Sequence, residues 1–147
     1  MFGMHQTFRR MVLLRNRLTG LHDDFAADKD EQGLWSACRI QHYPTGGGFL
    51  IPHTDEAAHG AVRRAGIEKS VNLILLMTKK GVDFHDGGGF VELNGRKVYY
   101  EDDYEVGDLV IYDETNVHGV DDVDPLAPLD MSSPGGRYTA LCTLMKA

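Results

Sequence analysis

Most of the chain, from about residue 33 to residue 145, is a succession of short segments with strand patterns, separated by turn residues. Alternating side chains predict a strand over 35–43, and a continuous apolar run predicts a strand buried on both faces over 70–77. Shorter strands are expected at 89–93, 96–100, 108–113 and 137–145. Many short strands joined by turns favour an antiparallel sandwich or jelly roll, in which two sheets form a cavity between them.

The first 22 residues differ from the rest, because they contain four arginines and no acidic residue. Their apolar residues recur at spacings of three and four, which predicts a helix with one face against the core: Phe8, Met11, Leu14, Leu18, Leu21 and Phe25. An arginine-rich transit peptide is the alternative interpretation of residues 1–22. A length of 147 residues suits one domain, so we expect a single unit over 1–147, with helical support from 1–32 packed on the outside of a β core at 33–147.

Charge, hydropathy and cysteine content argue against several classes of protein. The net charge of −7 disfavours nucleic acid as a partner, because phosphate binding requires clustered Lys and Arg. No apolar run approaches the roughly 18 residues that span a bilayer, so no membrane partner is expected. Cys38 and Cys142 lie far apart without a CxxC pattern, which predicts neither a disulfide framework nor a thiolate zinc site. We expect a cytoplasmic, reducing environment, and the sequence leaves the oligomeric state open.

The stretch IPHTDEAAHG, residues 51–60, places a histidine and an aspartate one residue apart in what otherwise looks like a buried apolar strand. Residues i and i+2 of a strand face the same way, so we expect His53 and Asp55 to project together into the interior. A buried carboxylate beside an imidazole is costly without a partner, and a divalent cation supplies the missing charge. His118, after the predicted strand 108–113, is the expected third ligand, and two histidines with one carboxylate form the three-ligand face of non-haem Fe(II) sites. A surface His-Thr-Asp turn without a metal is the alternative.

After this HxD motif the chain continues with a buried strand, GDLVIYD, HGV and then GGRYTAL. This order, over roughly residues 36–145, resembles the Fe(II)- and 2-oxoglutarate-dependent dioxygenases. The resemblance implies a double-stranded β-helix, a form of jelly roll, with iron held by His53, Asp55 and His118. It also implies 2-oxoglutarate and O2 as cosubstrates, release of succinate and CO2, and hydroxylation or desaturation of a substrate. Related halogenases lack the carboxylate ligand, so the presence of Asp55 disfavours halogenation.

The resemblance also implies which residues contact the cosubstrate. In the family, an arginine on a late strand, often followed two residues later by Ser or Thr, binds the far carboxylate of 2-oxoglutarate, and this maps onto Arg137 and Thr139. The planar fork of arginine matches a carboxylate, and the i, i+2 spacing places both side chains on one face of the strand. Tyr43, on the strand before HxD, resembles a tyrosine that contacts the cosubstrate in related enzymes. Because the gap between His118 and Arg137 is longer than the family usually shows, Arg96 is the alternative anchor.

The substrate side of the site is less determined by the sequence. Strand alternation and a polar break in the apolar run predict three cavity or substrate residues: Arg39, Gln41 and Asn72. A small polar molecule is the expected substrate, framed by loops at 56–69 and 121–136, and a protein or peptide side chain is the alternative. Two other classes stay open. One is a cupin-like metal enzyme that uses the same ligands with Zn or Mn and no oxo acid, and the other is a non-catalytic β-sandwich binding module.

Overall fold

The computed structural model describes residues 2–147, and the side chains of all of these except 2 and 57–59. The described chain has two α-helices, α1 (Phe2–Thr19) and α2 (Glu56–Arg64). Its strands are β1 (Leu34–Pro44), β2 (Gly48–His53), β3 (Val71–Leu76), β4 (Gly88–Leu93), β5 (Arg96–Tyr99), β6 (Leu109–Asp113), β7 (His118–Val123) and β8 (Gly136–Lys146). A short 3-10 helix, Tyr100–Asp102, directly follows β5.

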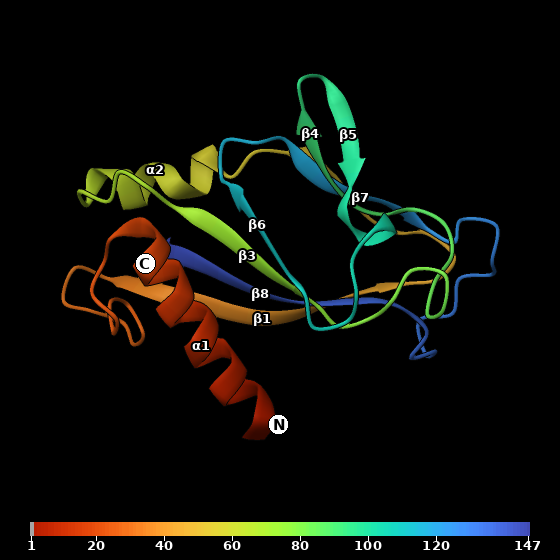
Figure 1. The fold of residues 1–147 in the computed structure, drawn as a ribbon, viewed down its shortest axis with the longest axis horizontal. Coiled ribbons are helices and arrows are strands. Elements are labelled where there is room, and N and C mark those ends of the chain that lie inside the picture. The colour runs from red at the N-terminus through yellow and green to blue at the C-terminus, as the bar shows by residue number, and fades with distance from the viewer. Residues whose placement is uncertain (1) are drawn as a thin grey trace.

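The strands form two antiparallel four-stranded sheets. One sheet has the order β1-β8-β3-β6, and the other has the order β2-β7-β4-β5. Figure 1 shows β1, β8 and β3 running side by side in one layer, while β4, β5 and β7 belong to the other. The fold is therefore mainly β, as the strand patterns predicted, and it is consistent with a β-sandwich.

Apolar and aromatic side chains from both sheets fill the interior. The largest cluster of buried residues consists of Ile74, Leu76, Val91, Tyr100, Val110, Tyr112 and Leu141. The long ladder between β1 and β8 pairs Tyr43 with Arg137 and Gln41 with Thr139. Directly opposed residues of an antiparallel pair lie on the same face of the sheet. This register therefore brings four of the predicted site residues to one face.

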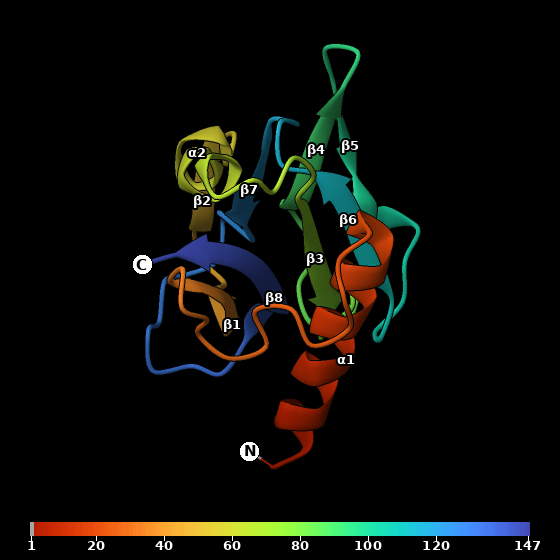
Figure 2. The same ribbon diagram turned by 90° about the vertical axis from the view of Figure 1, so that its left-hand side faces the viewer.

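Helix α1 packs against the outer side of the sheet that contains β3 and β8 (Figure 2). Met11 and Val12 are buried against Leu73 and Cys142, which lie on these two strands. Phe8, Leu14, Val71 and Leu75 are partly buried around this contact. The prediction that one apolar face of the helix packs against the core is thus confirmed for the middle of the helix.

The helix ends earlier than its apolar pattern. After Thr19, Gly20 takes a positive φ of 75°, and the N–H of Leu21 donates to the carbonyl of Asn16 at 2.8 Å, which closes the last turn. Leu18 is 53 % exposed, so its predicted burial is wrong. None of the described helices is both long and apolar enough to cross a lipid bilayer.

The segment 56–69, predicted to be a loop, contains the nine-residue helix α2. Its Val62 is completely buried and packs with Leu34 and Leu144, near one end of β1 and β8. The pattern EAAHGAVRR offers too short an apolar stripe to distinguish this helix from a loop. Tertiary contacts, which include this buried valine, therefore stabilise an element that the sequence did not indicate.

Two predictions about the second sheet were also wrong. β2 is an edge strand, and Ile51 is 65 % exposed, so residues 51–55 are not a buried strand. The loop predicted at 121–136 starts later, because β7 continues to Val123. β7 carries the sequence HGVDDV, which has neither a regular alternation nor a β-branched run.

Candidate metal centre

Two of the three predicted metal ligands lie on neighbouring strands. His53 is the last residue of β2, His118 is the first residue of β7, and the two are paired in the register of the sheet. Asp55 lies outside β2, at the start of α2, where its backbone N–H donates to the carbonyl of Glu114 at 3.1 Å. The prediction that His53 and Asp55 share a strand face is therefore wrong. The turn from β2 into α2 brings the carboxylate back towards the imidazole.

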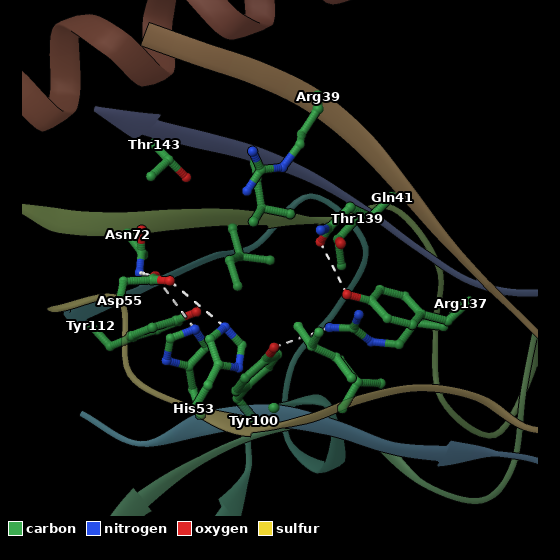
Figure 3. A pocket seen from close by; sticks show the side chains of 17 residues that line it. Arg39, Gln41, His53, Asp55, Asn72, Tyr100, Tyr112, Arg137, Thr139 and Thr143 are labelled. Atoms are coloured by element: carbon green, nitrogen blue, oxygen red, sulfur yellow. Dashed lines mark hydrogen bonds and ion pairs between the residues drawn. The ribbon is translucent and has the colours of Figure 1, made fainter. Parts of the chain in front are cut away.

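Possible ligand atoms of these three residues all lie within 4.8 Å of one another. The distance from His53 Nε2 to Asp55 Oδ1 is 3.7 Å, and the distance from His118 Nε2 to Asp55 Oδ2 is 3.5 Å. Figure 3 shows His53 and Asp55 together at one end of a cavity. Two imidazoles and one carboxylate in this arrangement could bind a metal ion.

Backbone carbonyls orient both imidazoles. His53 Nδ1 lies 2.8 Å from the carbonyl oxygen of Ile51, and His118 Nδ1 lies 3.0 Å from that of Asn116. Because a carbonyl oxygen only accepts hydrogen bonds, each contact requires a proton on Nδ1, which leaves Nε2 as the ring nitrogen that could bind a metal ion. Burial lowers the pKa of His118, which also favours the neutral imidazole that a metal requires.

Asn72 holds the carboxylate of Asp55 from the opposite sheet. Its Nδ2 donates to Asp55 Oδ2 at 2.6 Å, and its side chain is buried. Within the described part of the chain, the Oδ1 of Asn72 has no hydrogen-bond partner. The sequence placed Asn72 in the cavity, and the structure places it in direct contact with a candidate ligand. Two oriented imidazoles and a fixed carboxylate together fit a divalent metal ion.

The buried guanidinium of Arg137 lines the same cavity as the triad (Figure 3). Arg137 is only 1 % exposed, and its Nη2 donates to the hydroxyl of Tyr100 at 3.0 Å. Its Nε donates to Oε1 of Glu101, which is also buried. The guanidinium lies 5.0 Å from the ring centre of Tyr43. Arg137 therefore already has a carboxylate partner inside the protein.

The sequence did not reveal Tyr100 and Tyr112, which line the cavity, or Glu101, which forms the ion pair with Arg137. The Oε2 of Glu101 accepts a hydrogen bond from the backbone N–H of Gly89 at 2.5 Å. Burial raises the pKa of Glu101, while Arg137 and this N–H act in the opposite direction. A β-carbon added at Gly89 would lie 2.0 Å from the Tyr100 hydroxyl and 2.6 Å from Arg137 Nη2, so only glycine allows this approach. In the sequence, Glu101 begins an acidic run that is typical of a solvated surface.

The other predicted cosubstrate and substrate residues also line this cavity. Tyr43 donates its hydroxyl hydrogen bond to Gln41 Oε1 at 3.2 Å. Thr139 is buried, and no described residue is a hydrogen-bond partner for its Oγ1. Arg39 is exposed as a residue, and Figure 3 shows it reaching from β1 towards the cavity. Arg96 is exposed at the start of β5 and is not part of the cavity lining, which leaves Arg137 as the better-placed anchor.

The cavity has a volume of about 50 Å³, which is room for a few water molecules. It extends from the His53, Asp55 and His118 triad to Arg137 and is lined by both sheets. His53 and Asp55 have side chains that are 33 % and 23 % exposed, so the end of the cavity with the triad opens to solvent.

No protein-family model matches the chain, and no curated protein matches it significantly.

Proposed function

We propose that this protein is an Fe(II)- and 2-oxoglutarate-dependent oxygenase that hydroxylates a small polar molecule and releases succinate and CO2. The observation that carries the proposal is the convergence of His53, Asp55 and His118 at one end of a cavity that contains Arg137. Iron, when bound by the triad, would supply the activation of O2 that this reaction needs. The metal ligands lie at the more open end, where a substrate can approach.

The strand order supports the fold that this function implies. The orders β1-β8-β3-β6 and β2-β7-β4-β5 are those expected when an eight-stranded chain winds back and forth between two sheets, as in a jelly roll. A double-stranded β-helix is a fold of this kind. It places β2 and β7, which carry the two histidines, beside each other.

In this proposal the residues of the chain bind the metal ion and orient its ligands. The backbone carbonyls of Ile51 and Asn116 hold the two imidazoles, and Asn72 holds the carboxylate of Asp55, so that the metal meets a prepared set of ligands. The aromatic rings of Tyr112 and His118 are 4.8 Å apart, which restricts the imidazole further. His53, Asp55 and His118 would hold the metal ion, and these contacts would orient the three ligands before it binds.

Arg137 would bind the far carboxylate of 2-oxoglutarate. Glu101 and Tyr100 each use one of its N–H groups, and the remaining N–H groups have no hydrogen-bond partner among the described residues. Thr139 has a buried hydroxyl on the same strand and is also without a partner in the described chain. Glu101 is a positioning residue in this scheme, because it fixes the guanidinium without contacting the ligand.

A cupin-like metal enzyme that does not use an oxo acid is the second candidate, and a specific observation favours it. Glu101 already compensates the charge of Arg137, and the small cavity would have to open before it could hold 2-oxoglutarate. In that case Arg137 and Glu101 would serve only the stability of the fold. The two candidates differ in whether Arg137 affects ligand binding.

Turnover separates the candidates. We expect the Fe(II)-loaded protein to convert 2-oxoglutarate into succinate and CO2 in the presence of O2, and we expect His118→Ala to abolish this conversion. Arg137→Gln should weaken 2-oxoglutarate binding by about tenfold to a hundredfold, because a charge-assisted hydrogen bond contributes about 1.5–3 kcal/mol. Arg96→Gln is the matched control, since it removes an exposed arginine. Unchanged binding in both variants would favour the cupin-like enzyme.

A further inference from the structure

The two cysteines are far apart in the sequence but face each other in the fold. Cys38 of β1 and Cys142 of β8 are directly opposed in the antiparallel ladder. Opposed residues of such a ladder have Cα atoms about 4.5–5.5 Å apart, and a disulfide spans about 4.4–6.8 Å between Cα atoms. A bond between these two sulfur atoms therefore requires little movement of the backbone.

The two thiols differ in access. Cys38 is exposed, whereas Cys142 is buried beneath α1 beside Met11 and Leu73. Cys38 lines a groove of about 620 Å³ between α1 and residues 23–28. A small peptide disulfide can reach Cys38 through this groove, while Cys142 can react only with a neighbour. This arrangement is that of an attacking thiol and a resolving thiol.

A buried arginine lies beside this pair. Arg15 is 1 % exposed, and its Nη1 lies 3.9 Å from the Sγ of Cys142. Its other hydrogen bonds go to neutral acceptors on Asn16, Ser36 and Phe25. In the described chain, no carboxylate forms an ion pair with Arg15. A buried cation without a counterion favours the ionised form of a nearby thiol, although the hydrogen bond with Cys38 and burial keep the pKa of Cys142 above the ordinary value of a thiol.

The ionisation of Cys38 is consistent with this arrangement. The hydrogen bond with Cys142 lowers the pKa of Cys38 below the ordinary value of a thiol, and Arg15 acts in the same direction while burial opposes both. The thiolate is the form that attacks a disulfide. The more exposed member of the pair is thus also the better nucleophile.

We propose that Cys38 and Cys142 are a redox modification site that closes into a reversible cross-strand disulfide when it meets a small peptide disulfide such as oxidised glutathione. The thiolate of Cys38 attacks one sulfur of the oxidant, which forms a mixed disulfide and releases one thiol. Cys142 then gives up its proton and attacks the sulfur of Cys38, which releases the second thiol. The protein loses two protons and two electrons, and the oxidant gains them as it becomes two thiols.

The bridge would join the two strands that carry one wall of the cavity. Arg39 and Leu141 line the cavity and are the immediate neighbours of Cys38 and Cys142. The proposal does not depend on the oxygenase activity, because it rests on the outer face of the sheet. Its test therefore uses protein freed of metal with a chelator.

The experiment treats the reduced full chain with oxidised glutathione, alkylates the remaining thiols and measures the intact mass. We expect the wild type to lose two hydrogens, to gain no alkyl group and to carry no glutathione. Cys142→Ser should keep a stable glutathione adduct on Cys38, because the resolving thiol is missing. Cys38→Ser is the matched control and should keep Cys142 free of glutathione, since that thiol is buried.

Three outcomes would overturn the proposal. They are a wild type that retains the glutathione adduct, a wild type that forms disulfide-linked dimers through Cys38, and a wild type whose two thiols are both alkylated after the oxidant. The wild-type mass decides between these outcomes even if one of the variants fails to fold. Peptide mapping of the oxidised protein identifies the bridge directly.

Discussion

Replacement of Glu101 by glutamine tests how much the buried ion pair between Glu101 and Arg137 stabilises the fold. Glu101 and Arg137 have side chains that are 3 % and 1 % exposed, so neither charge can be compensated by water. Removal of one partner from a buried ion pair costs about 3–5 kcal/mol, because the other charge stays buried. Glutamine keeps the shape and one acceptor for the Arg137 Nε, so we expect Glu101→Gln to lower the free energy of unfolding by about 3 kcal/mol.

The assay is urea unfolding of a double-mutant cycle. We expect Arg137→Gln to destabilise the protein to a similar extent, since it leaves the Glu101 carboxylate buried without its cation. The double variant should lose less than the sum of the two single losses, with a coupling free energy of about 1–3 kcal/mol. Additive losses, or a loss below about 0.5 kcal/mol for Glu101→Gln, would refute the reasoning. Ligand binding by Arg137→Gln must therefore be measured at a urea-free condition in which that variant is shown to be folded.

Three further predictions concern the metal ligands and the cysteines. His53→Ala and His118→Ala should each abolish Fe(II) binding in calorimetry while circular dichroism stays unchanged, and full metal affinity in either variant would remove that residue from the ligand set. Asp55→Ala should eliminate hydroxylation, and a wild-type rate of product formation would show that the carboxylate is not a ligand. Oxidation of Cys38 and Cys142 closes a loop of about 100 residues, so the oxidised protein should resist urea better than the reduced protein by up to about 4.7 kcal/mol; equal midpoints would contradict the geometry of an unstrained bridge.

Periodicity and residue type predict most of the β structure. The apolar run at 70–77 and the alternation at 35–43 correspond to β3 and β1 because their side-chain patterns reflect burial on two faces or on one. The helix α2 and the strand β7 were missed because each is short and has a mixed pattern, so tertiary packing determines its conformation. Helix α1 was predicted in place but too long, since Gly20 rather than the apolar pattern ends it.

The candidate site shows what kind of information the sequence holds. The identity and order of His53, Asp55 and His118 were enough to bring them together as a hypothesis, although the backbone route to Asp55 was wrong. Glu101 and the carbonyls that orient the histidines could not be predicted, because an acidic run and a backbone oxygen carry no distinguishing pattern. The facing cysteines depend on the register of β1 and β8, which sequence separation hides.

The most direct test of the proposed function is an anaerobic titration of the Fe(II)-loaded protein with 2-oxoglutarate, followed by visible absorption spectroscopy. Chelation of iron by the 2-oxo acid group produces a metal-to-ligand charge-transfer band, and neither a structural metal site nor a cupin-like enzyme that ignores the oxo acid would produce it. We predict a saturable band that is absent from His118→Ala. A wild-type protein that binds Fe(II) but gives no band at saturating 2-oxoglutarate would contradict the proposed function.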